Sequence, residues 1–279
     1  MKKNMKFAAY SQDINNLLNS SSGGIFYEMA QEMIRRGGIV AGVIMDGLKT
    51  RYVLTDDLDV IKKMRGSKYI PSNPAKIIEK IKNCKKQILF TGLPCHIEAI
   101  KKKCDTSNII LCDLRCHGLP KNGIFERHME KVSKGRDIKS IQFRDKSAGW
   151  GNREISYSLI VRFSNGDIYD NFDQYLIDYL DNKTLRQNCK TCTKQNTGDI
   201  TIGDFWNVPP KLKNRMGTSI VILNTKKGYD FFMQIPTITK KKARWYHYLN
   251  LQNIAVGIYA KMQRAGMSKL LLILRRTIK

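Results

Sequence analysis

The chain has 279 residues, of which 42% are hydrophobic, so it is long enough to bury the core of one large domain. Its net charge is +25, which indicates attraction to an anionic partner such as nucleic acid, phospholipid head groups or a phosphorylated cofactor. No run approaches the ~18–20 apolar residues that span a bilayer, and the N-terminal apolar run is too short for a secretory signal. No DNA- or RNA-binding pattern accompanies the charge. The sequence therefore predicts a cytoplasmic protein without a specific nucleic-acid partner.

Apolar periodicity predicts alternating helices and strands in the first half of the chain. We expect helices at 24–36, 58–64, 74–83, 97–103 and 123–132, and strands at 39–45, 51–54, 87–91 and 108–112. The strand–helix–strand order over 87–112 implies parallel, neighbouring strands.

The second half of the chain changes character. Strands at 140–143, 155–163 and 167–169 are expected to be antiparallel, followed by a helix at 174–180 and strands at 199–203 and 219–223. The predicted fold class is therefore mixed α/β, with a sheet of parallel and antiparallel strands flanked by helices.

A basic amphipathic helix is predicted for residues 254–279, after a main domain at 1–253. Such a helix can pack on the domain or on a partner chain. Alternatively, it can hold the protein peripherally on the inner face of the membrane.

Four of the seven cysteines are placed where they could meet. Cys95 and Cys116 each follow one of the two predicted parallel strands, so both should emerge at the sheet edge where open α/β sheets bind ligands. Cys189 and Cys192 form a C-x-x-C before a further predicted strand. An odd number of cysteines in a reducing compartment fits four ligands and three bystanders better than a disulfide framework.

Four thiolates can hold either zinc or an iron–sulfur cluster. Zinc sites more often use two close pairs of cysteines. Two single cysteines and one C-x-x-C, with glycine and proline beside the ligands, suit a bulkier cluster, and zinc stays as the alternative. Cys112 is expected to be a buried residue within its strand, and Cys84 and Cys104 are expected to be incidental.

A series of short motifs carries a family resemblance over residues 8–206. They are Ser20-Ser21-Ser22-Gly23-Gly24, Arg65-Gly66-Ser67-Lys68-Tyr69, Gly92-Leu93-Pro94-Cys95, Cys116-His117-Gly118, Phe143-Arg144-Asp145-Lys146 with Gly149-Trp150, the C-x-x-C, and Asp199-Ile200-Thr201-Ile202-Gly203-Asp204-Phe205-Trp206. With these motifs the chain resembles the beta-subunit family of coenzyme F420 hydrogenases and dehydrogenases, which are flavin- and iron–sulfur-containing oxidoreductases.

The resemblance implies two cofactors, FAD and a [4Fe–4S] cluster, and it favours the cluster over zinc at the four cysteines. It suggests cofactor contacts from Ser20, Ser21, Ser22, Gly23, Gly24, Ser67, Lys68, Tyr69, Asp204 and Trp206. The serine–glycine run precedes a predicted helix, whose positive end would favour a pyrophosphate. Taken alone, that run could equally be an ordinary serine N-cap, and Ser67–Tyr69 a surface turn.

His117 and Lys146 are the candidate catalytic residues. A cation near the flavin ring would stabilise the reduced, anionic form, and an imidazole titrates near neutrality. His117 could instead support Cys116, and Lys146 could instead pair with Asp145 or bind solvent.

Two features of this sequence differ from the family pattern and affect what can be expected of its electron-transfer partner and its substrate. Many members carry an N-terminal ferredoxin-like module, whereas this sequence starts almost directly at the flavin domain. We therefore expect a separate ferredoxin-like electron carrier, unless electron transfer has been lost. His96 stands where glutamine is common, which leaves the substrate open.

The predicted function is that of an FAD- and iron–sulfur-dependent oxidoreductase acting on a small-molecule or sugar-linked substrate. Bacterial relatives often accompany surface-polysaccharide genes, so that pathway is as plausible as a role with coenzyme F420. The first alternative is a non-catalytic accessory protein with a structural zinc or cluster. The second is a basic scaffold that binds membrane or nucleic acid through charge.

Overall fold

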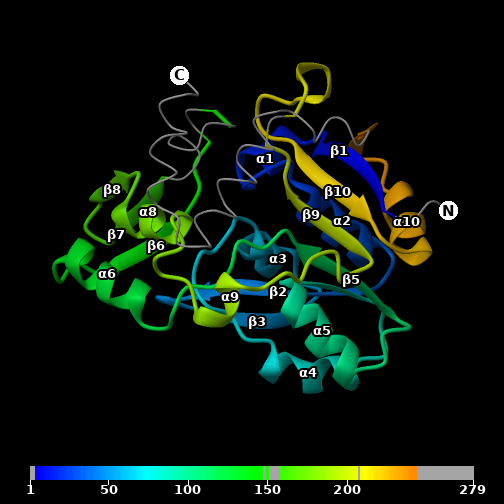
Figure 1. Ribbon diagram of the computed structural model, residues 1–279, viewed down its shortest axis with the longest axis horizontal. Coiled ribbons are helices and arrows are strands. Elements are labelled where there is room, and N and C mark those ends of the chain that lie inside the picture. Colours follow the sequence, from blue (N-terminus) through cyan, green and yellow to red (C-terminus); the bar gives the residue numbers. More distant parts are fainter. Residues whose placement is uncertain (1–3, 147–148, 151–157, 207, 244–279) are drawn as a thin grey trace.

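The computed structural model describes residues 4–146, 149–150, 158–206 and 208–243 (Figure 1). An eight-stranded sheet has the order β11-β1-β10-β9-β5-β4-β2-β3. Its strands are β1 (Met5–Ser11), β2 (Ile39–Asp46), β3 (Lys49–Thr55), β4 (Ile88–Gly92), β5 (Ile109–Leu114), β9 (Ile200–Asp204), β10 (Ser219–Leu223) and β11 (Ile238–Lys242).

Helices cover both faces of this sheet (Figure 1). One face packs on α2 (Ile25–Arg35), α3 (Leu58–Met64) and α10 (Lys226–Met233), and the other on α4 (Ala75–Lys82) and α5 (Pro94–Lys103). Because successive strand residues point to opposite faces, Leu89 joins the first cluster and Phe90 joins the second.

A smaller, three-stranded sheet lies beside the main one, in the order β6-β7-β8. It contains β6 (Ile138–Gln142), β7 (Leu159–Phe163) and β8 (Ile168–Asn171), and it packs with α6 (Ile124–Ser133) and α8 (Gln174–Leu180). Phe125, Phe163 and Leu176 are buried in this separate cluster. Three short helices complete the described elements: α1 (Ile14–Leu18), α9 (Gln187–Lys190) and the 3-10 turn η1 (Pro210–Leu212).

Strand direction and stagger decide which loops meet. β2, β4, β5 and β9 are mutually parallel, and β1 runs in the same direction because it is antiparallel to β10, the antiparallel neighbour of β9. In the register of β5 with β9, Cys112 lies opposite Ile200, so β9 begins beside the carboxyl end of β5. Three segments therefore converge on one region of the sheet: those that follow β4 and β5, and the one that precedes β9.

The predicted mixed α/β class is confirmed, and the predicted parallel pairing of the strands before Cys95 and Cys116 is confirmed as β4 with β5. The expected loop at Cys95 is wrong, because Pro94 at the first helical position starts α5 three residues before the predicted helix. The sequence interpretation missed β1, α10 and β11. The residues of β11 are mostly lysines, which suit an edge strand that must not pair with another chain.

The predicted helix at 254–279, and with it the boundary at 253, lies outside the described residues. Within the described part of the chain, no helix combines the length and the apolar character needed to cross a bilayer.

Candidate functional site

The two single cysteines lie at the carboxyl ends of neighbouring parallel strands. Cys95 is in the first turn of α5, directly after β4, and its side chain is exposed. Cys116 follows the end of β5 by two residues and is half-buried. The adjacent pairing of Gly92 with Asp113 brings these two chain segments side by side.

The C-x-x-C is brought to Cys116 by backbone pairing between distant segments. Pro120 forms an isolated bridge with Leu185, and the Arg186 N–H donates to the Leu119 carbonyl at 2.9 Å. The Leu119 N–H donates to the Cys189 sulfur at 3.4 Å. Gly118 adopts φ +139°, and a side chain there would lie 3.2 Å from the Cys189 Cβ. Glycine after Cys116 therefore allows this close approach.

The four thiols are close enough to influence one another's ionisation. The pKa of Cys116 is raised to about 12, chiefly by burial and to a smaller extent by negative charge on Cys95, Cys189 and Cys192. The pKa of Cys95 is likewise raised, first by burial and then by charge on Cys189 and Cys192. Raised pKa values favour the neutral thiols, so a cationic metal group would be needed to hold all four cysteines as thiolates. Among the described residues, no group of three or more His, Cys, Asp or Glu side chains lies in an arrangement that could hold a metal ion.

Two buried carboxylates hold the chain between the C-x-x-C and β9: Asp113, which the sequence interpretation missed, and Asp199, which it quoted in a motif without giving it a role. Asp113 accepts hydrogen bonds from the N–H groups of Thr197 and Gly198 and from the Thr201 hydroxyl, at 3.2, 3.0 and 2.7 Å. Burial nevertheless raises the pKa of Asp113. The position of Asp113 at the end of an apolar strand was the available signal.

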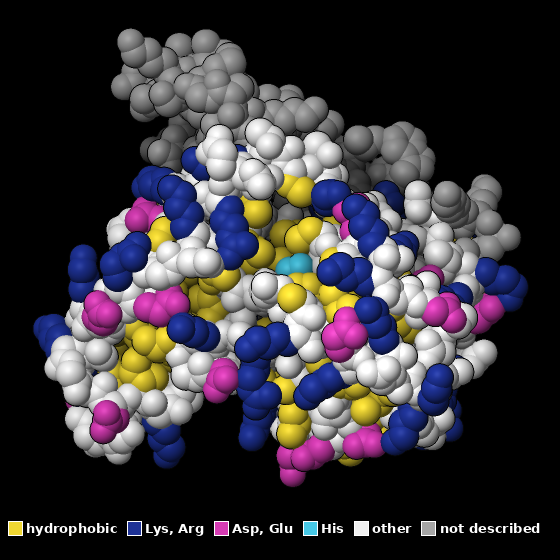
Figure 2. Space-filling model, turned by 90° about the horizontal axis from the view of Figure 1, so that it is seen from below, with side chains coloured by type: hydrophobic (Ala, Val, Ile, Leu, Met, Phe, Trp, Pro, Cys, Tyr) yellow, Lys and Arg dark blue, Asp and Glu magenta, His cyan; other side chains and the backbone are white. Residues whose placement is uncertain are grey.

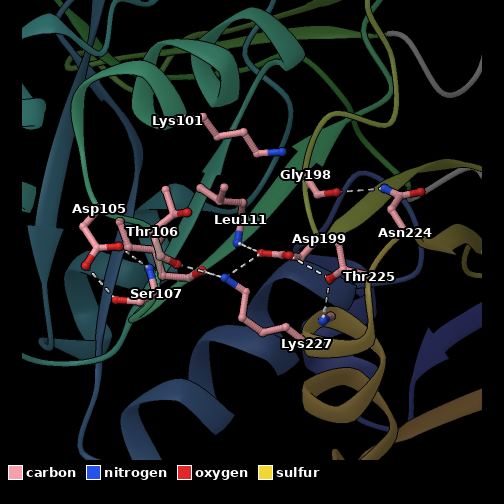
Figure 3. A network of polar contacts seen from close by, with 12 residues as sticks. Lys101, Asp105, Thr106, Ser107, Leu111, Gly198, Asp199, Asn224, Thr225 and Lys227 are labelled. Carbon is pink, nitrogen blue, oxygen red and sulfur yellow. Dashed lines mark hydrogen bonds and ion pairs between the residues drawn. The ribbon is translucent and has the colours of Figure 1, made fainter. Parts of the chain in front are cut away.

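Asp199 holds the same part of the chain through a second set of polar contacts (Figure 3). It accepts the Leu111 N–H at 2.9 Å and the Thr225 hydroxyl at 2.7 Å, and it pairs with Lys227 at 3.3 Å. Asp199 thus joins β5, the segment that enters β9 and the start of α10.

The serine–glycine loop lies at the carboxyl end of β1, between α1 and α2. Gly23 is buried so closely against β1 and β10 that a Cβ would lie 2.4 Å from the Ala9 carbonyl. Its N–H donates to the Ser219 hydroxyl at 2.9 Å, and its carbonyl accepts from the Ser11 N–H at 2.7 Å. Gly24 takes φ +75° as the residue before α2.

The three serines of the loop make contacts within the protein. Ser20 donates to the Asn16 side chain at 3.0 Å, and Ser22 donates to the Thr218 carbonyl at 3.1 Å. The Ser21 hydroxyl accepts the Ser67 N–H at 2.7 Å, which joins two of the predicted cofactor motifs.

Lys146 joins this loop to a third segment. Its ammonium is buried and donates to the carbonyls of Leu17, at 2.8 Å, Met216, at 2.7 Å, and Ser22. The pKa of Lys146 is lowered to about 7, chiefly by burial and then by the charge of Arg144, while the charge of Asp204 acts in the opposite direction. The bonding is to main-chain oxygens, whereas the sequence alternatives were Asp145 or solvent.

Lys68 and Tyr69 follow α3, and Tyr69 packs against the hydrophobic cluster of the smaller sheet. The Lys68 ammonium donates to the carbonyls of Met64, Arg65 and Gly66 at 3.0–3.1 Å, at the end of α3, and burial lowers its pKa to about 7. The Tyr69 ring contacts Tyr179 with a centroid distance of 5.0 Å.

Asp204 and Trp206, at the end of β9, surround a buried arginine. Arg144 pairs with Asp204 at 2.9 Å and donates to the Tyr69 hydroxyl at 3.3 Å. Its guanidinium lies 5.4 Å from the centre of the Trp206 ring, which stacks on Trp150 at 5.2 Å. Arg144 stands in a motif quoted above, but the sequence interpretation did not single it out.

His117 connects the cysteines to this aromatic group. It is exposed, its Nε2 lies 3.2 Å from the Tyr179 carbonyl, and its ring packs edge-on against the Tyr179 ring. The Tyr179 hydroxyl in turn donates to the Gly118 carbonyl at 3.0 Å. His117, Tyr179 and Tyr69 therefore form a continuous path of contacts from the loop of Cys116 toward Arg144.

His96, the departure from the family pattern, is buried beside Cys95. Its Nδ1 lies 2.8 Å from the Tyr52 hydroxyl, and burial lowers its pKa to about 4. The imidazole is therefore neutral at physiological pH, and the Tyr52 contact fixes its orientation.

The side of the molecule where α4, α5 and α9 lie in Figure 1 faces the viewer in Figure 2. This face is hollowed between two lobes. Hydrophobic side chains line the hollow, and Lys and Arg side chains gather around it (Figure 2).

Comparison with known proteins finds a matching family and a solved structure with a similar fold. The family that matches, over residues 85–242, is described as the C-terminal part of the beta subunit of coenzyme F420 hydrogenase/dehydrogenase. The fold is similar to that of a chain in the F420-reducing [NiFe] hydrogenase complex from Methanosarcina barkeri. The similarity has a TM-score of 0.63 at 17% identity and covers 86% of this chain and 82% of that chain. No curated protein matches the sequence.

Proposed function

The chain belongs to the family of coenzyme F420 hydrogenase/dehydrogenase beta subunits, and from this premise we propose that it is an FAD- and [4Fe–4S]-dependent oxidoreductase. Cys95, Cys116, Cys189 and Cys192 are the proposed cluster ligands. FAD is proposed to bind along the same sheet edge, next to the serine–glycine loop.

One observation carries the proposal: three chain segments far apart in sequence bring four thiols within electrostatic reach of one another. Three backbone features support this close approach. Gly118 leaves room for Cys189, the Leu119 N–H donates to the Cys189 sulfur, and Asp113 accepts a hydrogen bond from the chain that follows the C-x-x-C. A cluster held there would supply one-electron transfer, and FAD would couple single electrons to two-electron chemistry on a substrate.

The residues around the serine–glycine loop support the proposal of a bound flavin. Ser21 is bonded to Ser67, and Lys146 holds the loop of Ser22. Arg144 and Trp206 add a cation and an aromatic ring. This combination of hydroxyls, cations and rings suits a ligand that has both phosphates and a flat ring system.

His117 and Lys146 have distinct proposed roles. His117 is exposed, so it can exchange a proton with a substrate or with solvent. Lys146 is a positioning residue, because its donors hold the main chain of the serine–glycine loop. Its charge would also favour an anionic reduced flavin.

The proposed substrate is a small or sugar-linked molecule, in surface-polysaccharide biosynthesis or in a reaction with coenzyme F420. The hollow in Figure 2, with hydrophobic sides and a basic rim, suits a molecule that has a flat apolar part and an anionic group.

Anaerobic purification tests the proposal. We expect a brown protein with broad absorbance near ~400 nm and flavin bands, together with FAD released on denaturation. A colourless protein with one zinc and no flavin would instead assign the four cysteines to a structural site in an accessory protein.

A further inference from the structure

The exposed thiols are surrounded by cationic side chains. We define the basic rim as Lys101, Arg115, Arg186, Lys190 and Lys194. Lys190 lies within the C-x-x-C, and Lys194 follows Cys192 by two residues and pairs with Glu98 on α5, the helix that also carries Cys95, so both side chains belong to the segments that hold the thiols.

Two other members of the rim are held by hydrogen bonds. The Lys101 ammonium donates to the Thr197 carbonyl at 2.6 Å, and the Arg186 guanidinium donates to the Pro120 carbonyl at 3.2 Å and to the Asn122 side chain at 2.6 Å. Arg115 is exposed beside Cys116.

Acidic side chains near the rim are already paired. Glu98 forms an ion pair with Lys194. On α8, which carries Tyr179 beside His117, Asp178 pairs with Lys183 at 3.0 Å, and Asp181, directly after this helix, pairs with the same lysine at 3.8 Å. The surface around the thiols therefore carries excess positive charge.

We propose that the basic rim is the docking surface for a small acidic electron-carrier protein, which exchanges electrons with the cluster held by the four cysteines. This inference rests on the proposed function. In each encounter the reduced carrier loses one electron and the cluster gains one, no bond forms or breaks, and no proton is transferred. Two encounters supply the two electrons that a flavin needs.

Charge complementarity and the composition of the surface favour a protein over a membrane or nucleic acid. Residues 191–196 are all exposed and read Thr-Cys-Thr-Lys-Gln-Asn, without an apolar side chain to enter a bilayer or an aromatic ring to stack on a base. Opposite charges accelerate protein association, and the gain falls as salt rises.

The test compares two variants with the same change in charge. Lys190→Gln/Lys194→Gln removes two charges from the rim. Lys85→Gln/Lys103→Gln removes two exposed charges near the start of β4 and the end of α5, which lie at the opposite edge of the main sheet. A reduced small acidic ferredoxin is mixed anaerobically with each holoprotein, and the rate of cluster reduction is followed at several salt concentrations.

We expect the rim variant to be reduced about tenfold more slowly than wild type at low salt, and the control variant to keep the wild-type rate. Reduction by a cationic viologen should be at least as fast in the rim variant as in wild type, which shows that its cluster is intact.

Equal, salt-independent rates with ferredoxin in a cluster-containing protein would overturn the docking surface and leave the proposed function in place. The same holds if the rim variant loses only binding to anionic phospholipid vesicles or to single-stranded DNA. A wild-type protein without a cluster would overturn both proposals.

Discussion

The cysteines and the serine–glycine loop lie on the same edge of the main sheet but present their polar groups differently. Cys95 and Cys192 are exposed, and the pKa of Cys95 is raised by burial and then by charge on Cys189 and Cys192. By contrast, Ser22, Gly23 and Lys146 are already bonded to neighbouring segments. The cysteine end presents the proposed cluster ligands, whereas the serine end is held in place by hydrogen bonds within the protein and forms the proposed wall of the flavin site.

Replacing a proposed cluster ligand should have the largest effect. Cys116→Ser exchanges a thiolate for a poorly ligating hydroxyl, so the purified protein should lose most of its iron and acid-labile sulfide. Cys104→Ser, at a half-buried cysteine outside the set, is the control and should keep both. Full iron content in Cys116→Ser would remove that residue from the ligand set.

Arg144→Met tests whether the serine end is organised by the protein rather than by its cofactor. The side chains of Arg144 and Asp204 are 2% and 16% exposed, so the change leaves a largely buried carboxylate unpaired. We expect a loss of about 3 kcal/mol in the free energy of unfolding, measured in urea on the cofactor-free protein. Adding Asp204→Asn should recover part of that loss. A cost below about 1 kcal/mol, typical of a surface pair, would contradict the buried role of Arg144.

Lys146→Met should change the pH dependence of stability. The pKa of Lys146 is about 7 in the folded chain and near its ordinary value, about 10.4, in the unfolded chain. Between these pH values the unfolded chain binds more protons, so the stability contributed by position 146 rises with pH. The melting temperature of wild type minus that of the variant should therefore increase by about 2 °C or more from pH 7 to pH 9.

The exposed Lys63→Met is the matched control for this measurement. Melting temperatures of wild type and Lys146→Met that change in parallel with pH would show that the Lys146 ammonium is not buried in the folded protein.

Single serine changes should have the smallest effect on stability. Ser20→Ala and Ser22→Ala each remove one hydrogen bond at a half-buried position, so each should cost about 1 kcal/mol or less. FAD content gives the second measurement on the same proteins. Unchanged stability with much less bound FAD would show that the hydroxyl serves the cofactor more than the fold.

The sequence predicted the positions of those residues that directly follow parallel strands. Cys95 and Cys116 could be placed at one edge because strands in a β–α–β unit run the same way. The route of the C-x-x-C could not be predicted, because it depends on the stagger of β9 against β5 and on the pairing of Pro120 with Leu185.

Contacts between side chains and loops far apart in the sequence were harder to predict. Lys146 was recognised as a candidate, yet its contacts with Leu17, Ser22 and Met216 arise only when three separate segments meet. Asp113 looked like the ordinary end of a strand. Its role depends on the backbone of residues 197–201, which the sequence pattern does not place.

An anaerobic crystal structure with iron located by anomalous scattering tests the central claim most directly. The account predicts a single [4Fe–4S] cluster enclosed by the sulfurs of Cys95, Cys116, Cys189 and Cys192. A single zinc ion among these sulfurs, or an iron cluster bound elsewhere in the chain, would contradict it.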